Sequence, residues 1–183
     1  MLLAVVGPSG AGKDTLMGLA RARLDGDARF RFVQRAITRP AEAGGEAHRP
    51  LDAAAFDAER AAGGFALHWG AHGLFYGIPR DIEADLSARR VVVANLSRGV
   101  LADAASRYRL RVLVVTAPLA LLAARLAARG REAAEDIAAR LQREMTLAPG
   151  LDVVTVMNDA TPENGAARVV AELTRAAEDA RRS

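Results

Sequence analysis

Short apolar runs alternate along this chain with longer segments in which apolar residues recur every three or four positions. Apolar runs of about four to eight residues are typical of buried strands, and the longer periodic segments are typical of amphipathic helices. The pattern predicts strands at residues 2–6, 31–35, 91–95, 111–116 and 153–157. It predicts helices at residues 13–24, 53–62, 81–90, 98–108, 118–129, 132–147 and 162–181. Strands that alternate with helices favour an α/β fold with a parallel five-stranded sheet flanked by helices.

Residues 36–78 interrupt this alternation, because they contain many glycines, two aromatic clusters and one short predicted helix. We interpret them as a small inserted substrate lobe. A second, short and polar excursion surrounds Gly130 between two arginine-bearing helices, as expected of a mobile lid. We therefore expect one domain over residues 1–183, with its core at 1–35, 79–125 and 141–183, the substrate lobe at 36–78 and the lid at 126–140.

The 183 residues, 51% hydrophobic and 26% charged, are enough for one sizeable hydrophobic core. The absence of cysteine excludes disulfides, thiolate zinc sites and cysteine nucleophiles. The apolar run at residues 1–6 is too short for a signal peptide, and no run approaches the roughly 20 apolar residues of a membrane span. We expect a cytoplasmic protein with no membrane partner.

The first predicted strand leads into a glycine-rich loop that contains the only lysine among the 25 basic residues. The loop has the spacing G-x-x-x-x-G-K and precedes a predicted helix, which is the context of a phosphate-binding P-loop rather than of a structural turn. Its backbone N–H groups would surround phosphate oxygens, and Lys13 would reach the β and γ phosphates as a compact point charge. The motif therefore predicts a nucleoside triphosphate site at Gly7, Pro8, Ser9, Gly10, Ala11, Gly12, Lys13, Asp14 and Thr15.

The metal ligands of this loop depart from the usual pattern. Asp14 follows the lysine where Ser or Thr usually binds magnesium, and a hydroxyl comes one position later, in Thr15. The predicted strand 91–95 ends in Asn95, where an Asp would be expected to hold the metal. One interpretation makes Asp14, with Thr15, a ligand of Mg²⁺. The alternative is a carboxylate that only stabilises the first turn of a helix.

Several features, in order along the chain, resemble the guanylate kinase branch of the nucleoside monophosphate kinases. They are the loop at 7–15, Thr38-Arg39-Pro40, the stretch 69–79 with Phe75-Tyr76-Gly77, the arginines at 125–131, Arg140 and Asn158-Asp159. The resemblance covers nearly the whole chain and implies a P-loop NTPase fold of the nucleoside-monophosphate-kinase type. It implies that Arg39 and Tyr76 hold the phosphate of the acceptor and that Arg129 and Arg140 close on the transferred group. It also places Asn158 at the nucleotide.

The groups that read guanine in that branch are absent here. His68 stands before Trp69 in place of a Glu, and Ile78 follows the Tyr-Gly pair in place of a Ser. The acidic Asp-x-Asp pattern is replaced by the sequence Val-Ala-Asn-Leu at residues 93–96. Imidazole, alkyl and amide groups have thus replaced the acceptors suited to the N–H donors of guanine.

The same region gains basic groups: Arg35 lies four residues before Arg39, and His48 and Arg49 follow a Gly-Gly-Glu turn. This set, together with residues 12–15, 38–46 and 65–69, resembles the ribose 1,5-bisphosphate phosphokinases. The resemblance implies ATP-dependent formation of 5-phosphoribosyl 1-diphosphate in phosphonate catabolism, with a small-molecule acceptor that carries two phosphates and no base. The candidate substrate-binding residues are Arg35, Arg39, His48, His68, Tyr76 and Arg98.

A phosphate acceptor is already ionised near neutral pH, so transfer to it needs positioning and charge neutralisation rather than a general base. The catalytic candidates are therefore Lys13, Arg129 and Arg140, with Arg125 and Arg131 also able to meet the transferred group when the lid closes. For Arg125, which lies in an apolar helical stretch, a solvated helix face is an equal alternative.

The histidines do not form a convincing metal pair. His68 and His72 are four apart, but Gly70 and Gly73 interrupt any helix that would bring them to one face. Three other functions compete with the kinase: a guanylate kinase, a non-catalytic guanylate-kinase-like binding module, and a nucleic-acid binder. The chain lacks the base-reading acids that a guanylate kinase needs. A non-catalytic module would have no use for Lys13 and the lid arginines. A nucleic-acid binder would show a basic stripe with interleaved aromatics, which the chain lacks. The sequence does not determine the oligomeric state.

Overall fold

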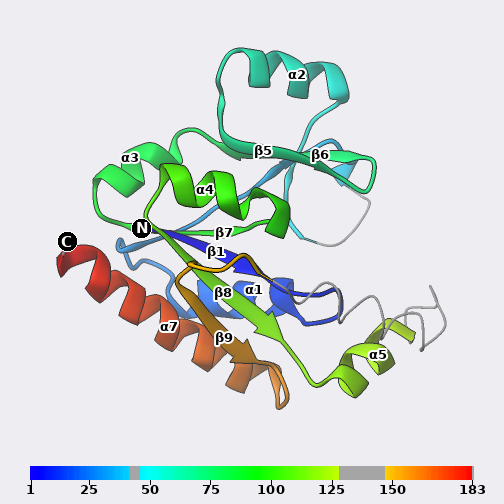
Figure 1. Ribbon diagram of the computed structural model, residues 1–183, viewed down its shortest axis with the longest axis vertical. Coiled ribbons are helices and arrows are strands. Elements are labelled where there is room, and N and C mark those ends of the chain that lie inside the picture. Colours follow the sequence, from blue (N-terminus) through cyan, green and yellow to red (C-terminus); the bar gives the residue numbers. More distant parts are fainter. Residues whose placement is uncertain (42–45, 128–146, 183) are drawn as a thin grey trace.

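The central feature of the fold is a parallel five-stranded sheet with the strand order β2-β7-β1-β8-β9 (Figure 1). The computed structural model describes residues 1–41, 46–127 and 147–182. The strands of this sheet are β1 (Leu2–Val6), β2 (Phe30–Phe32), β7 (Val91–Asn95), β8 (Leu110–Thr116) and β9 (Val153–Met157). The predicted fold class, a parallel sheet with helices on both sides, is confirmed.

Helices cover both faces of this sheet because β1 and β7, at its centre, are apolar on both sides. Leu3 and Val5 pack on one face with α1 (Lys13–Arg23) and α7 (Pro162–Arg182). Leu2, Ala4 and Val6 pack on the other with α3 (Ile82–Ser87), the 3₁₀ turn η2 (Arg98–Val100) and α4 (Leu101–Arg107). In Figure 1, α5 (Leu119–Ala127) extends from the carboxyl end of β8.

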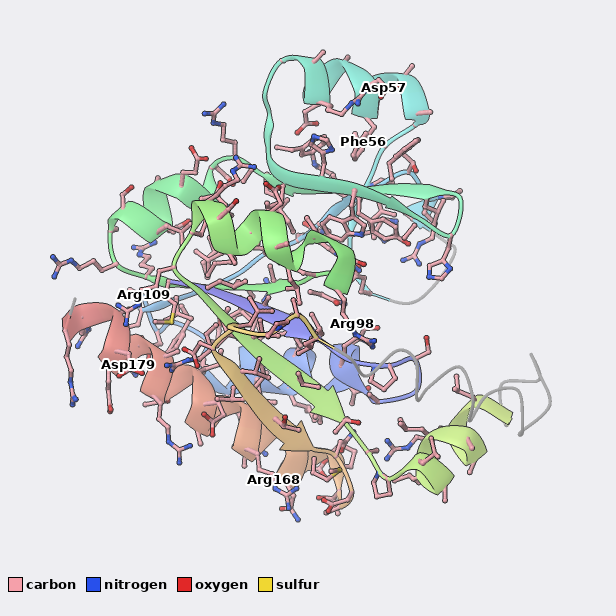
Figure 2. All side chains as sticks on the ribbon, viewed as in Figure 1. Phe56, Asp57, Arg98, Arg109, Arg168 and Asp179 are labelled. Carbon is pink, nitrogen blue, oxygen red and sulfur yellow. The ribbon has the colours of Figure 1, made fainter. Side chains whose placement is uncertain are left out.

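The segment between β2 and α3 forms a second sheet of its own, with the order β4-β3-β6-β5. It consists of β3 (Ala36–Ile37), β4 (Arg49–Pro50), β5 (Phe65–Ala71) and β6 (Leu74–Pro79), with α2 (Ala53–Ala61) lying over it. Phe56 of α2 stacks on Phe65 at a centroid distance of 4.7 Å and points from the helix to this sheet in Figure 2. This sheet thus has a small apolar core separate from that of the central sheet.

The strands of this second sheet are the main elements that the sequence pattern missed. β5 and β6 form an antiparallel hairpin whose two turn residues, His72 and Gly73, both have positive φ, as a type I′ turn requires. The predicted strand at 31–35 is also misplaced. The backbone N–H of Val33 makes a hydrogen bond to Val93 O, beyond which the chain leaves the central sheet to enter β3.

Residues 132–146 of the helix predicted at 132–147 and most of the predicted lid at 126–140 lie outside the described residues, and residue 147 is not helical. Among the residues that the structure describes, no helix is both long and apolar enough to cross a membrane.

Candidate active site

The P-loop lies at the carboxyl end of β1, where the chain turns into α1. Gly10 and Gly12 have φ values of +82° and +86°, which L side chains rarely adopt. At Gly7 an added Cβ would lie only 2.0 Å from Val115 O, so the loop can pass this close to β8 only with a glycine there. The glycine spacing of the sequence is therefore required by the path of the backbone.

Lys13, the first residue of α1, curves back over the loop. Its Nζ donates to Gly7 O at 2.8 Å and to Pro8 O at 3.1 Å. These carbonyl groups hold the ammonium across the loop, where the backbone N–H groups of a P-loop meet phosphate. Nothing needs to refold for Lys13 to exchange these carbonyl oxygens for phosphate oxygens.

Two side chains hold the loop from outside it. Asn158, which follows β9 and is buried, donates from Nδ2 to Ala11 O at 2.8 Å. Arg125 of α5 donates from Nη1 to Gly10 O at 3.3 Å. Asn158 thus contacts the backbone of the loop, and its predicted contact with the nucleotide stays a prediction. The contact of Arg125 was not foreseen, since the sequence offered the transferred phosphate or solvent as its partner.

A chain of polar contacts connects the P-loop with the second sheet. Asn95, buried at the carboxyl end of β7, donates from Nδ2 to Asp14 Oδ1 at 3.3 Å and to Glu46 Oε2 at 3.2 Å. The other oxygen of Glu46, Oε1, accepts from Arg35 Nε at 2.8 Å and forms an ion pair with Nη2 of the same residue. Residues from four separate segments therefore meet in one network beside the loop.

The aromatic residues of the hairpin lie under Arg35. Trp69 of β5 and Tyr76 of β6 are cross-strand partners, and their rings stack at a centroid distance of 5.4 Å and an interplanar angle of 7°. The guanidinium of Arg35 lies 5.0 Å from the centroid of Tyr76 and 5.7 Å from that of Trp69. Tyr76 is thus brought to the site, and Trp69 joins it, although the sequence suggested only a core position for Trp69.

Arg39 and His48 form the next contact along this side of the site. The ring nitrogens of His48 lie 3.0 Å from the backbone oxygens of Glu46 and Arg39, and Nη2 of Arg39 lies 3.3 Å from Nδ1 of His48. His48 is buried, so it holds the two ends of the 39–46 segment together. Within the described ranges, Nε of Arg39 is buried without a hydrogen-bond partner and no carboxylate pairs with Arg39. A half-buried cation with an unsatisfied buried N–H favours an anionic ligand.

A cavity of about 230 Å³ opens between the P-loop and the end of β7. Its lining comprises Val6, Gly7, Leu96, Ser97 and Arg98. Figure 2 shows Arg98 at the same end of the central sheet as the P-loop, whereas Arg109 and Asp179 lie at the opposite end. The predicted residue Arg98 is therefore in place to meet a ligand in this cavity.

The remaining positions that the sequence singled out are placed as follows. His68 is exposed and adjacent to Trp69 in β5, so its side chain lies on the opposite face of the hairpin from the Trp69–Tyr76 stack. Ile78 is buried in the core, and Leu96 is nearly fully buried where it lines the cavity. Arg129, Arg131 and Arg140 lie outside the described residues. The structure therefore does not bring His68 to the acceptor side.

Sequence reasoning missed Glu46, and it considered Asn95 only at the metal position and as a replacement for a guanine-reading acid. Glu46 could have been noticed, because it ends the Gly-Gly-Glu sequence of a motif that was already matched. It was overlooked because a carboxylate repels phosphate, so its role is evident only once Arg35 and Asn95 are known as its partners. Asp159, next to Asn158, is exposed, and a hydrogen bond from Arg168 lowers the pKa of its carboxyl.

The residues at the loop fit a magnesium ion. The cation prefers oxygen ligands and, in kinases, takes most of them from phosphates and water. The Asp14 carboxylate and the Thr15 hydroxyl follow Lys13 at the start of α1, and both residues are exposed. Three or more His, Cys, Asp or Glu side chains do not gather into a metal site anywhere in the described part of the chain.

No family model matches the chain. It is 52% identical over 158 residues to ribose 1,5-bisphosphate phosphokinase PhnN of Brucella melitensis biotype 2, which covers 85% of this chain and 82% of that protein. It is 48% identical over 173 residues to the protein of the same name from Methylobacterium radiotolerans, covering 94% of this chain and 96% of that protein. A bifunctional ribose 1,5-bisphosphokinase-thymidine phosphorylase of Azorhizobium caulinodans is 52% identical over 171 residues, and the chain spans 25% of its length.

Solved structures agree on the fold. A guanylate kinase of Anaplasma phagocytophilum superposes with a TM-score of 0.69 over 96% of this chain and 84% of its own, at 16% sequence identity. A gluconokinase of Sinorhizobium meliloti 1021 gives a TM-score of 0.51 over 97% of this chain and 93% of its own, also at 16% identity. Both are P-loop kinase neighbours. Since the relatives named above match along most of this chain, it belongs to the ribose 1,5-bisphosphate phosphokinase family.

Proposed function

We propose that this protein transfers the γ-phosphoryl group of ATP to ribose 1,5-bisphosphate and forms 5-phosphoribosyl 1-diphosphate. The observation that carries the proposal is Arg39, which lies on the acceptor side without a carboxylate partner among the described residues and with its Nε unsatisfied. The names of the relatives, at 43–52% identity, support the same acceptor. The acceptor is a small molecule that carries phosphate at both ends and no base.

The donor side of the reaction is the P-loop. The N–H groups that follow Gly7, with the amino end of α1, hold the β and γ phosphates, and Lys13 neutralises the charge that develops between them. Asp14 and Thr15 would hold Mg²⁺, which when bound neutralises phosphate charge and orients the triphosphate. Asn158 and Arg125 hold the loop in its phosphate-ready shape through the carbonyl groups of Ala11 and Gly10.

On the acceptor side the 1-phosphate of the sugar is the nucleophile. One of its oxygens forms a bond to the γ-phosphorus, the bond between this phosphorus and the β,γ-bridging oxygen breaks, and ADP leaves with that oxygen. The attacking oxygen is already ionised, so no side chain removes a proton. Arg39 and Arg98 hold the phosphates of the sugar, and the proposed lid arginines Arg129 and Arg140 complete the site when the lid closes.

The test is a panel of acceptors with ATP and Mg²⁺: ribose 1,5-bisphosphate, ribose 5-phosphate and GMP, followed by ADP release and by ³¹P NMR of the product. We expect kcat/KM for ribose 1,5-bisphosphate to exceed that for GMP by at least about 100-fold, because the Glu46 carboxylate is already paired with Arg35 and Asn95 and so is not free to pair with the base. The product should show the two coupled phosphorus signals of a diphosphate and one monophosphate signal. Preferred use of GMP would overturn the proposal in favour of a guanylate kinase.

A further inference from the structure

The side chain of Arg35 is unusually enclosed for a cation in a substrate site. It is only 12% exposed, and its planar guanidinium lies over the Tyr76 and Trp69 rings at 5.0 and 5.7 Å. The two rings stack on each other nearly in parallel, and the guanidinium lies close to both, so the stack is an aromatic platform for a planar group. A platform of this kind gives a planar ligand stacking energy on its face.

The carboxylate of Glu46 completes the enclosure. Oε1 accepts from Nε and Nη2 of Arg35, and Oε2 accepts from Asn95, so both oxygens are occupied and the group is held in one orientation. The Glu46 side chain is 18% exposed. A desolvated ion pair gives little net stability, and a carboxylate opposes the binding of phosphates nearby. The pair therefore calls for a functional explanation.

The hydrogen-bonding groups of a guanidinium suggest a functional explanation for the pair. A stacking platform flanked by a fixed carboxylate is the arrangement that binds a base whose edge carries adjacent N–H donors, with the ring on the aromatic face and the edge on the carboxylate. A guanidinium is planar and carries adjacent N–H donors as well, and Arg35 uses two of its five on Glu46. Arg35 thus satisfies, from within the chain, the same contacts that such a base would make.

We propose that the Arg35–Glu46 pair is a specificity determinant: it fills the planar-ligand site of the second sheet and so excludes nucleotides whose base has an N–H-rich edge. The inference rests on the proposed function, since it explains how a phosphate acceptor without a base is selected. The pair leaves three N–H groups of Arg35 for other acceptors, which include the phosphates of a base-free sugar. A base is then excluded because the Arg35 guanidinium occupies its volume and because the Glu46 carboxylate is already paired.

The experiment is the substitution R35A, which removes the guanidinium and leaves Glu46, Trp69 and Tyr76 in place. Binding of GMP is measured by titration calorimetry, with CMP as the comparison because its base lacks the N–H edge of guanine. We expect R35A to bind GMP at least about 10-fold more tightly than the unsubstituted protein does, with CMP changed less than about threefold. The double variant R35A/E46Q should lose the gain, because an amide replaces one of the two acceptor oxygens of the carboxylate with an NH₂ donor.

Guanidinium ion provides a second readout that a purely structural role would not give. At about 20 mM, far below denaturing concentrations, guanidinium chloride should compete with GMP for R35A and restore part of its turnover of ribose 1,5-bisphosphate. The matched control is R111A, because Arg111 is similarly enclosed at 15% exposure and is ion-paired to Asp152 and Asp179 away from the site. R111A should show neither a gain for GMP nor a response to guanidinium.

The outcomes separate this inference from the proposed function. GMP affinity of R35A within twofold of that of the unsubstituted protein, in a variant with normal circular dichroism, would overturn the specificity role, whatever the acceptor. Failure of the unsubstituted protein to use ribose 1,5-bisphosphate would overturn the proposed function, and it would be seen in the acceptor panel without any variant.

Discussion

Two positively charged side chains, Lys13 and Arg39, are central to the proposed chemistry, and they are held differently. Lys13 bridges two carbonyl groups of its own loop, so it is positioned by the backbone that it serves. Arg39 is positioned through His48 and keeps an unsatisfied Nε within the described residues. The first arrangement is local in sequence, and the second depends on the fold of the inserted segment.

Lys13→Ala should reduce kcat by at least about 1,000-fold, because removal of one preorganised donor to developing charge typically lowers rates by about 100- to 1,000-fold and this donor is a full cation. Circular dichroism and Tm should stay close to those of the unsubstituted protein. The control is Arg21→Ala, which removes an exposed cation from the other end of α1 and should change the rate less than twofold. Activity of Lys13→Ala within tenfold of normal would contradict the assignment.

Arg39→Ala should raise the KM of the sugar bisphosphate or lower kcat by about 10- to 100-fold, since a hydrogen bond between charged groups contributes roughly 1.5–3 kcal/mol. The affinity for ATP should change little, and steady-state kinetics with each substrate varied in turn separates the two effects. Arg60→Ala on α2, an exposed residue paired with Asp57, is the matched control. A loss confined to ATP binding would show that Arg39 serves the donor side.

Packing between helices also controls the shape of the P-loop. Gly165 of α7 lies against α1 and against the residue that holds the loop: an added Cβ would lie 2.9 Å from Leu16 Cδ2 and 3.0 Å from Asn158 Oδ1. Both neighbours are buried, and Asn158 is tied to Ala11. The Asn158 side chain therefore connects the position of α7 with that of the loop.

Gly165→Ala should lower stability by about 1–3 kcal/mol, because overlap with two buried side chains outweighs the roughly 1 kcal/mol gained in helix propensity. It should also weaken ATP binding, since Asn158 must move. Gly18→Ala in α1 is a sharp control, because its Cβ would meet nothing within 4 Å and the propensity gain should raise stability. Chemical denaturation and nucleotide titration measure the two effects, and equal stabilities for the two alanine variants would contradict this account.

At the scale of the whole molecule, ion pairs join α3 to the central sheet near the points where the chain leaves for the second sheet and returns from it. Asp85 of α3 pairs with Arg31 of β2 and with Arg90, which precedes β7. Burial alone would raise the pKa of the Asp85 carboxyl, but the hydrogen bonds from Arg31 and Arg90 outweigh it and the net shift is downward. The ionised form is thus favoured in the folded state.

A lowered pKa in the folded state means that this contribution to stability is complete above the unfolded-state pKa, 3.8, and is lost as the pH falls through the lower folded-state value. Asp85→Asn should therefore lower Tm by several degrees at pH 7, and the difference from the unsubstituted protein should shrink below about pH 4. Asp81→Asn, at 66% side-chain exposure, should have a much smaller effect. A Tm difference between Asp85→Asn and the unsubstituted protein that stays constant from pH 7 to pH 3 would contradict the role of Asp85.

The predicted strands at residues 2–6, 91–95 and 153–157 match β1, β7 and β9, because each is a contiguous apolar run with a clear boundary. The strand predicted at 31–35 begins one residue earlier and ends at Phe32, because Val33 extends the apolar run while the chain is already leaving the sheet. β3 and β4 have two residues each and give no periodic signal. The β5–β6 hairpin had a signal in its alternating residues and its His-Gly turn, but the surrounding glycines obscured it.

The P-loop could be read directly because everything that defines it is local: a strand, a glycine-spaced loop, a lysine and a helix within residues 2–23. The network on the acceptor side could not, because Asp14, Arg35, Glu46 and Asn95 come from four segments and Asp14 and Asn95 are 81 positions apart. Local spacing fixes which groups one element presents, whereas the meeting of distant groups depends on the order of strands in the sheet. That order brings β7 beside β1, so that the Asn95 amide reaches both the loop and Glu46.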